Sequence, residues 1–189
     1  MAMPLTEYFS AAAVRALPED GKRYETVHGE LLVTPAPGVA HQVVQARLFL
    51  ILGNYLAGHG LEQLLSSPAD LSWGDDSLVQ PDLFVVELDA SIASRRWSDI
   101  GTLHLVIEIL SPSSVRVDRF TKRRLYQEQR IPVYWIVDIE HRQVEVWTPD
   151  AHFPVIEREQ LVWRHPALEQ ECRIDLGVLI PESPAPSSS

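Results

Sequence analysis

Two apolar segments of strand length constrain the fold of this chain more than any other feature. Residues 103–110 and 133–137 consist largely of large apolar residues, without the polar and apolar alternation that a half-exposed strand shows. Such segments are typical of strands that are covered on both faces. Between them, residues 118–129 are polar but place Leu125 and Tyr126 at apolar helical positions. The sequence therefore predicts a strand, a helix and a second strand in a sheet that helices cover.

Elements of both kinds are expected around this unit. Apolar residues recur at helical spacing over residues 39–57, and a shorter helix is expected over residues 5–17 with Thr6 as its N-cap. The strands are expected in a hairpin over residues 24–34 that turns at Gly29, within residues 61–80, at 83–86, and from 143–147 through edge strands to about residue 173, with a polar connection over 89–101. This order predicts the α/β (α+β) class, as a mixed β-sheet flanked by helices, with an N-terminal helix and β-hairpin and C-terminal edge strands.

Length and composition bound the domain organisation. The chain has 189 residues, of which 46% are hydrophobic, and this fits one domain with a core of its own. We assign that domain to residues 1–180. Residues 181–189 are rich in proline and serine and have nothing to bury, so a disordered tail is expected there. The single cysteine, Cys172, excludes a disulfide within the chain and a zinc site built from cysteines.

Hydropathy and charge indicate a cytoplasmic protein without a membrane partner. No apolar segment approaches the ~20 residues of a bilayer-spanning helix, and the first residues lack the pattern of an export signal. The formal net charge of −10 argues against non-specific coating of nucleic acid. Four arginines nevertheless gather in one window, and they form either a local basic surface or an ordinary solvated helix face: Arg116, Arg119, Arg123 and Arg124.

Two carboxylates interrupt segments that the apolar pattern predicts to be buried. Glu108 stands inside residues 103–110, and Asp82 follows Pro81 directly before residues 83–86. Because a buried carboxylate without a partner costs several kcal/mol, each is expected to be paired, hydrogen-bonded or bound to a cation. Carboxylate oxygens are the ligands that Mg²⁺ and Mn²⁺ prefer. Two acids at the ends of neighbouring strands therefore indicate a metal site, with exposed or ion-paired positions as the alternative.

Lysine is rare in this chain, which makes Lys122 stand out. Of the 16 basic residues only Lys22 and Lys122 are lysines. A compact ammonium can orient a water molecule in a way that a guanidinium cannot. Lys122 lies on the helix expected after the strand of Glu108, from which it could reach over the strand ends. An ordinary surface position is the alternative.

The order of these residues resembles a known family. The segments that carry the resemblance are Tyr24-Glu25, Gly29-Glu30, Pro35 with Pro37, His41-Gln42, Pro81-Asp82, residues 106–113, Asp118 with Lys122 and Tyr126, and residues 134–138. Together they span roughly residues 19–176. This ordered set resembles the Uma2 family, whose fold is similar to that of the PD-(D/E)XK restriction endonucleases. By that resemblance Asp82 is the acid of the first half-motif and Glu108 the acid of the second.

The chain departs from the superfamily motif two residues after Glu108. Leu110 stands where the general motif has lysine, and the resemblance implies that Lys122 on the next helix takes over the role. Smaller departures, at His28, at Val133 and at the start of the strand over residues 103–110, remove no proposed ligand.

The resemblance implies a metal-dependent endonuclease that hydrolyses phosphodiester bonds of nucleic acid, with DNA as the expected substrate. Asp82, Glu108 and the carbonyl of Ile109 would hold Mg²⁺ or Mn²⁺. Lys122 would orient water or neutralise developing charge, and Glu30 would bind the metal through water. Contacts to the nucleic acid backbone would come from Arg116, Arg119, Arg123 and Arg124.

Some assignments stay open from the sequence. His41, at the start of the long helix, is a candidate for lining the site, with capping or packing as the alternative. The alternative function is a catalytically inactive module that binds nucleic acid or protein on the same fold, which the overall acidity favours. A homodimer is expected by analogy only. Signatures of serine hydrolases, P-loop NTPases and zincins are absent from the sequence.

Overall fold

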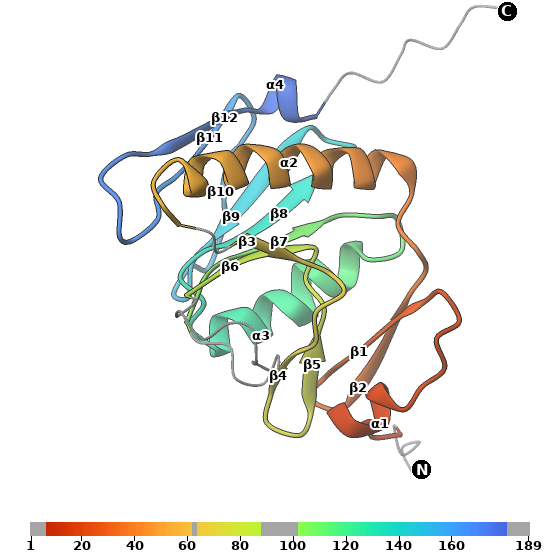
Figure 1. The fold of residues 1–189 in the computed structure, drawn as a ribbon. Coiled ribbons are helices and arrows are strands. Elements are labelled where there is room, and N and C mark those ends of the chain that lie inside the picture. The colour runs from red at the N-terminus through yellow and green to blue at the C-terminus, as the bar shows by residue number, and fades with distance from the viewer. Residues whose placement is uncertain (1–6, 62–63, 88–101, 181–189) are drawn as a thin grey trace, which may run out of the picture.

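The computed structural model describes residues 7–61, 64–87 and 102–180. Its centre is a six-stranded sheet with helix α2 (Val39–Ala57) on one face and helix α3 (Arg123–Glu128) on the other (Figure 1). In spatial order the strands are β10 (Val155–Glu157), β9 (Gln143–Trp147), β8 (Tyr134–Asp138), β7 (Leu103–Ile109), β6 (Leu83–Val86) and β3 (Leu64–Ser66). This architecture confirms the predicted mixed sheet flanked by helices.

The two apolar segments form β7 and β8, which run parallel to each other, whereas β6 and β9 are antiparallel to their neighbours in the sheet. Nearly all residues of β7 and β8 are buried, as their continuous apolar sequence predicts. A parallel pair needs a crossover connection, which is made by the π-helical turn η3 (Val117–Lys122) and α3. The crossover begins at the carboxyl end of β7, so it brings η3 beside that end of the strand.

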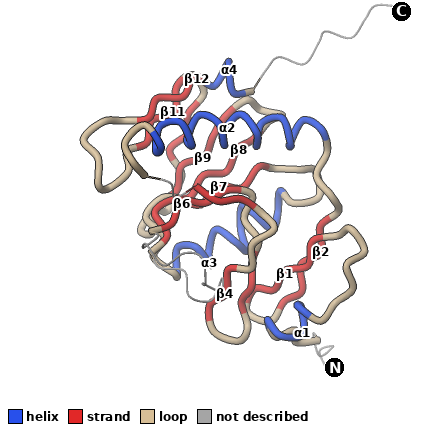
Figure 2. The backbone as a smooth tube through the Cα atoms, in the orientation of Figure 1, coloured by secondary structure: helices blue, strands red, loops and turns tan. Residues whose placement is uncertain are grey.

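The N-terminal hairpin belongs to a second sheet of four strands (Figure 2). Its spatial order is β2 (Glu30–Thr34), β1 (Arg23–Val27), β5 (Ser77–Val79) and β4 (Leu71–Trp73). The hairpin turns at His28 and Gly29, whose φ angles of 51° and 80° match the right-handed twist of the strands. A Cβ atom on Gly29 would also meet the Tyr8 ring, so both the positive φ and the space favour glycine there.

The first helix is shorter than the sequence pattern suggested. α1 covers Ala11–Arg15, and the Ser10 side chain caps it by accepting a hydrogen bond from the Ala13 N–H. Directly before this cap, the Phe9 N–H donates to the Gly29 carbonyl at 3.0 Å, which ties the chain to the hairpin instead of to a helix. The predicted start is therefore wrong. Thr6, the expected N-cap, lies outside the described residues.

The C-terminal strands divide between two places. β10 forms an edge of the central sheet, whereas β11 (Gln160–Trp163) and β12 (Cys172–Asp175) pair with each other in a separate sheet. With the following helix α4 (Leu176–Leu179) they pack against α2. The polar connection expected over 89–101 and the tail expected over 181–189 lie outside the described residues. In the part of the chain that is described, no helix is long and apolar enough to cross a membrane.

Candidate active site

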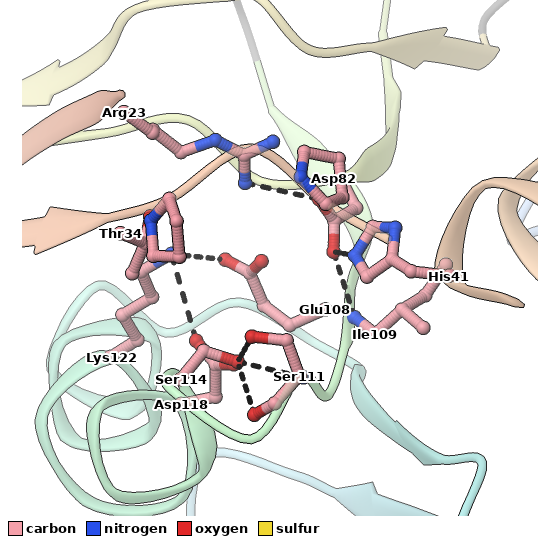
Figure 3. A pocket seen from close by; sticks show the side chains of 12 residues that line it. Arg23, Thr34, His41, Asp82, Glu108, Ile109, Ser111, Ser114, Asp118 and Lys122 are labelled. Carbon is pink, nitrogen blue, oxygen red and sulfur yellow. Dashed lines mark hydrogen bonds and ion pairs between the residues drawn. The ribbon is translucent and has the colours of Figure 1, made fainter. Parts of the chain in front are cut away.

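A small pocket lies where β1, β6, β7, α2 and η3 converge (Figure 3). β6 is antiparallel to β7, with Leu83 opposite Ile107. The residue before β6 therefore lies beside the last residues of β7, and this register brings Asp82 opposite Glu108 and within hydrogen-bond reach of the Ile109 N–H. The cavity measures about 30 Å³, which is room for one or two species the size of water.

Asp82 is held by donors from three different elements. Its Oδ1 accepts from Arg23 Nη1 on β1 at 3.0 Å, and its Oδ2 accepts from the Ile109 N–H on β7 at 2.8 Å. His41 Nε2, from the first turn of α2, lies 2.9 Å from the same Oδ2. Burial alone would raise the pKa of Asp82, but the His41 hydrogen bond and the Arg23 charge outweigh it and lower that pKa below its ordinary value. Asp82 is therefore an ionised carboxylate although it is only 2% exposed.

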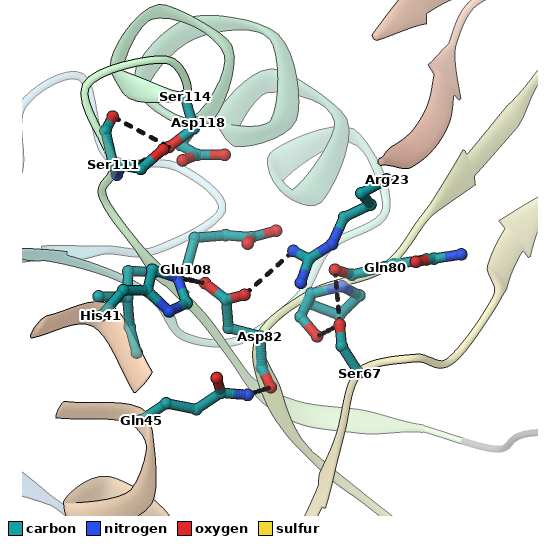
Figure 4. Close-up of polar contacts among 12 residues, drawn as sticks. Arg23, His41, Gln45, Ser67, Gln80, Asp82, Glu108, Ser111, Ser114 and Asp118 are labelled. Atoms are coloured by element: carbon teal, nitrogen blue, oxygen red, sulfur yellow. Dashed lines mark hydrogen bonds and ion pairs between the residues drawn. The ribbon is translucent and has the colours of Figure 1, made fainter. Parts of the chain in front are cut away.

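The backbone around Asp82 is also fixed (Figure 4). Gln45 Nε2, one helical turn after His41 on α2, donates to the Asp82 carbonyl at 3.0 Å. The Ser67 N–H donates to the same carbonyl at 3.3 Å, and the Ser67 hydroxyl donates to the Pro81 carbonyl at 2.8 Å. These contacts hold the position of the Asp82 side chain before any ligand arrives, which is what a pre-organised site requires.

The other side of the pocket is centred on the ammonium of Lys122. Its Nζ lies 2.8 Å from Glu25 Oε1, 3.0 Å from Glu108 Oε1 and 3.6 Å from Asp118 Oδ1. The Tyr126 hydroxyl also donates to Glu108 Oε1, at 2.9 Å. Burial alone would lower the pKa of Lys122, but the attraction of the three carboxylates raises it above its ordinary value. Lys122 is therefore a permanent buried cation.

The π-helical turn explains how the crossover supplies two of these groups. Asp118 and Lys122 both lie on η3 and both are buried. Residues four apart lie on the same side of a helical turn, so both side chains face the strand ends. Single π-helical turns are frequent at functional sites, where they change the direction of a side chain within an otherwise regular helix.

Carboxyl groups outnumber cations around this pocket. Glu25, Asp82, Glu108 and Asp118 are buried carboxyl groups, and the cations beside them are Lys122 and Arg23. Among the described residues, Glu25 Oε2 and Asp118 Oδ1 are buried without a hydrogen-bond partner. Burial raises the pKa of Glu108 well above its ordinary value and that of Asp118 to about 6, and neighbouring carboxylates add to both shifts. The cluster therefore favours the uptake of protons or of a cation.

The donor atoms around the pocket fit a hard divalent cation. Alternate residues of a strand direct their N–H and C=O groups to the same side, and the Ile109 N–H points to Asp82, so the Ile109 carbonyl faces that side too. Asp82, Glu108 and this carbonyl are oxygen donors of the kind that Mg²⁺ prefers. Within the described residues, no three His, Cys, Asp or Glu side chains form a complete metal cage. A complete cage is not required, because proteins commonly bind Mg²⁺ through one or two carboxylates, water and phosphate.

Comparison with known proteins decides the family. The model of the Uma2 family, described as "Putative restriction endonuclease", matches residues 11–177. The chain belongs to the Uma2 family. Among solved structures, the crystal structure of "a putative nuclease belonging to DUF820" from Anabaena variabilis ATCC 29413 is similar, with a TM-score of 0.70 and 18% sequence identity. The match covers 91% of this chain and 97% of that chain, and it shows a shared nuclease-like fold. A comparison with curated proteins gives no match.

The fold of this Uma2 chain brings most of the expected site residues together. Asp82, Glu108, Ile109, Lys122 and His41 all line the pocket, although they come from the residue before β6, from β7, from η3 and from α2. His41 contributes Nε2 to Asp82, and its Nδ1 is buried without a hydrogen-bond partner among the described residues. Their convergence follows from the strand register and the crossover, which the sequence alone does not give.

Glu30 does not join this cluster. It is exposed at the first residue of β2, next to the hairpin turn. The outer carboxylate near Lys122 is Glu25, which is fully buried and accepts a hydrogen bond from the Gln80 N–H at 2.7 Å. The structure therefore places Glu25, and not Glu30, beside Lys122. The signal was the alternation of β1, which places Arg23 and Glu25 on one face of the strand.

The four arginines of the basic window do not form one surface. Arg119 is bound at 2.6 Å to both Asp138 and Glu145, and Arg123 lies over the Trp147 ring at 4.6 Å from its centroid. These two side chains hold the crossover against β8 and β9 through those contacts. Arg116 and Arg124 are exposed, and Arg124 pairs with Glu128 at 2.8 Å. The expectation of a four-arginine nucleic acid surface is thus reduced to its two exposed members.

The sequence pattern missed two residues that line the pocket, Asp118 and Arg23, and also Glu25, which contacts Lys122 behind it. Asp118 stands four residues before Lys122, a spacing that places both on one side of a helix, and this signal was available. Arg23 could not have been found in this way. Its contact with Asp82 joins β1 of one sheet to the start of β6 in the other.

Proposed function

We propose that this Uma2 chain is a metal-dependent endonuclease that hydrolyses phosphodiester bonds of nucleic acid, with DNA as the expected substrate. The observation that carries the proposal is the excess of buried carboxyl groups over cations around the pocket, where Glu25 Oε2 and Asp118 Oδ1 accept no hydrogen bond from the described residues. A purely structural ion cluster would be expected to match its buried carboxyl groups with as many cations, because a buried charge that is poorly compensated is costly. A divalent cation would neutralise that excess.

Asp82, Glu108 and the Ile109 carbonyl are the groups that would hold Mg²⁺ or Mn²⁺. When bound, such an ion stabilises charge on the scissile phosphate and lowers the pKa of a bound water. Asp82 is already ionised and its backbone is fixed, so its carboxylate is in position before an ion arrives. Glu108 must lose its proton when its pKa is raised, which makes ion binding dependent on pH.

Lys122 would act as a fixed positive charge and hydrogen-bond donor. Its raised pKa keeps it protonated, so it cannot take a proton from the attacking water. The three carboxylates around it hold Nζ in place beside Glu108. In this position its ammonium would orient the water or stabilise the negative charge that develops on the phosphate.

Asp118 is the group best suited to accept the proton of the water. Its pKa of about 6 lies close to neutral pH, the range in which a general base is most effective. The oxygen atom of the water bonds to phosphorus, its proton passes to the carboxylate, and the bond from phosphorus to the leaving oxygen breaks. Glu25 would serve as a positioning residue for Lys122.

The cavity also limits how nucleic acid can reach the site. Its volume of about 30 Å³ admits a water or an ion but not a nucleotide. Only the phosphate edge of a strand would therefore approach the carboxylates. An adjoining, more open cavity of about 440 Å³ shares His41 and Ser111 with the first, and it offers space for the neighbouring part of the substrate.

The test combines metal binding with cleavage. Calorimetry with Mn²⁺ is expected to show binding by the wild-type protein and a loss of at least about tenfold in affinity for Asp82→Asn, because a ligand is removed. Glu108→Gln is expected to abolish Mn²⁺-dependent cleavage of plasmid DNA, single-stranded DNA or RNA offered in parallel. Glu169→Gln, the same change at an exposed position, is the matched control. Binding of nucleic acid without Mn²⁺ binding or cleavage would support the inactive module instead.

A further inference from the structure

The contact between Arg23 and Asp82 occupies the carboxylate oxygen that a metal ion would need. Oδ2 of Asp82 already accepts from the Ile109 N–H and lies beside His41 Nε2. Oδ1 is therefore the oxygen with more room for another partner, and Arg23 Nη1 contacts it at 3.0 Å. Figures 3 and 4 show the guanidinium reaching across the pocket to this oxygen.

A guanidinium in this place opposes the binding of a divalent cation. Arginine stays charged at every accessible pH, so it cannot leave by losing a proton. Two positive centres bound to the same carboxylate oxygen would repel each other strongly in a pocket with little water. Either Arg23 prevents metal binding, or it moves away from Asp82 when the ion arrives.

The position of Arg23 allows it to move. Its side chain is 21% exposed, whereas Asp82 and Lys122 are 2% and 3% exposed. The described contact with Asp82 uses the single nitrogen Nη1. Arg119, by comparison, is locked by two nitrogens to two carboxylates at 2.6 Å. Arg119 is 25% exposed, so the two arginines are similarly accessible, and it is the single direct contact of Arg23 that makes its hold weaker.

We propose that Arg23 is an exchangeable counter-ion, which holds Asp82 while no metal is bound and turns to the substrate phosphate when the metal takes its place. This inference rests on the proposed function of the same site. The planar guanidinium suits a phosphate because it can donate two parallel hydrogen bonds. Metal and phosphate would therefore bind with positive coupling, because the metal releases the arginine that the phosphate then uses.

Calorimetry with Mn²⁺ alone tests the first half of the exchange. Arg23→Met keeps the length of the side chain but removes its charge, and it is expected to bind Mn²⁺ about tenfold more tightly than the wild type. Arg47→Met is the matched control, since Arg47 is a partly buried arginine that donates to the Val178 carbonyl, away from the pocket. Unchanged or weaker Mn²⁺ binding by Arg23→Met, with binding by the wild type intact, would overturn the inference.

Fluorescence anisotropy tests the second half. The probe is a labelled DNA duplex with phosphorothioate linkages, which resist hydrolysis. With Mn²⁺ present, Arg23→Met is expected to bind this duplex about tenfold more weakly than the wild type, because one charged phosphate contact is lost. Without Mn²⁺ the two proteins are expected to bind equally, and a loss of the same size in both conditions would show a fixed phosphate contact without exchange.

The wild-type protein offers a measurement that does not depend on the variant folding. In an NMR titration with Mg²⁺, the Nε–Hε signal of Arg23 is expected to shift with the same midpoint as the calorimetric binding curve. A signal that stays in place while Mg²⁺ binds would contradict the exchange. If no ion binds to any of the proteins, the proposed nuclease function fails and not the role of Arg23 alone.

Discussion

The pKa values of the buried carboxyl groups shift in opposite directions on the two sides of the pocket. Asp82 is surrounded by donors from β1, β7 and α2, and its pKa is lowered although burial opposes this. Glu108 and Asp118 share the cation Lys122 with Glu25, and the pKa values of Glu108 and Asp118 are raised. One side is therefore a stable anion before any ligand binds. The other side gains stability from a proton or a further cation, and groups with shifted pKa values of this kind are frequent at functional sites.

The largest expected effect on stability comes from removing the charge of Lys122, which lies among the three carboxyl groups on its side of the pocket. Lys122→Met leaves three buried carboxyl groups without their ammonium, and it is expected to lower the free energy of unfolding by about 3–5 kcal/mol. Urea unfolding followed by circular dichroism measures the change. Lys22→Met is the matched control, because Lys22 is the other lysine of the chain and pairs with Asp20 at the surface. If Lys22→Met unfolds at as low a urea concentration as Lys122→Met, the loss of stability is not specific to the buried lysine.

The next largest effect is expected in the pH dependence of stability, to which the carboxyl groups on the two sides of the pocket contribute with opposite sign. Asp118 has a folded-state pKa of about 6, raised from 3.8, so its protonated form is favoured by folding. Its contribution is fully present below the unfolded pKa and is lost as pH rises through about 6, and the loss is on the order of 3 kcal/mol. Thermal unfolding in EDTA at pH 4.5 to 8 is expected to show this decline. Mg²⁺ should restore more stability at pH 7.5 than at pH 5.

Asp82 contributes at the other end of the pH scale. Because its pKa is lowered in the folded protein, its contribution to stability is present above the unfolded value and is lost as pH falls below about 4.

The Asp118→Asn variant tests the decline of stability between pH 5 and 7. If the stability of this variant still falls as steeply as that of the wild type over this range, the decline is not due to Asp118.

Paired substitutions test the comparison at constant pH. Asp82→Asn weakens the contacts with Arg23 and His41, and we expect it to destabilise the metal-free protein by about 1–3 kcal/mol at pH 7. Asp118→Asn removes one of the crowded charges, so the same measurement is expected to show equal or greater stability than the wild type. Equal destabilisation by both changes would mean that the two carboxylates contribute in the same way to stability at pH 7, which contradicts the comparison.

The smallest effect is expected at Glu30. Glu30→Gln changes an exposed side chain of the hairpin, and both Mn²⁺ affinity and unfolding temperature should match the wild type. Glu25→Gln, two positions after Arg23 on the same face of β1, should change both. Loss of Mn²⁺ affinity in Glu30→Gln would restore the role that the family resemblance assigned to that residue.

Much of the fold was open to prediction because it depends on local patterns. Continuous apolar residues specified β7 and β8, helical spacing specified α2, and the turn at Gly29 specified the hairpin. The start of α1 was predicted wrongly because Ser10 and Thr6 are both good caps, and the choice between them depends on the contact between Phe9 and the hairpin. That contact joins segments distant in the sequence, so no local pattern reports it.

The candidate site likewise has features that local sequence patterns predict and features that depend on tertiary contacts. The sequence by itself determined that Asp82 and Glu108 would be buried acids in need of partners, and that Lys122 would follow on the next helix. Only the tertiary structure decided that Glu25 and not Glu30 joins them, and that Arg119 and Arg123 brace the crossover. It alone placed Arg23 on Asp82. The reason is physical: local patterns report which groups leave water, whereas the partner of each buried charge is set by strand register and sheet packing.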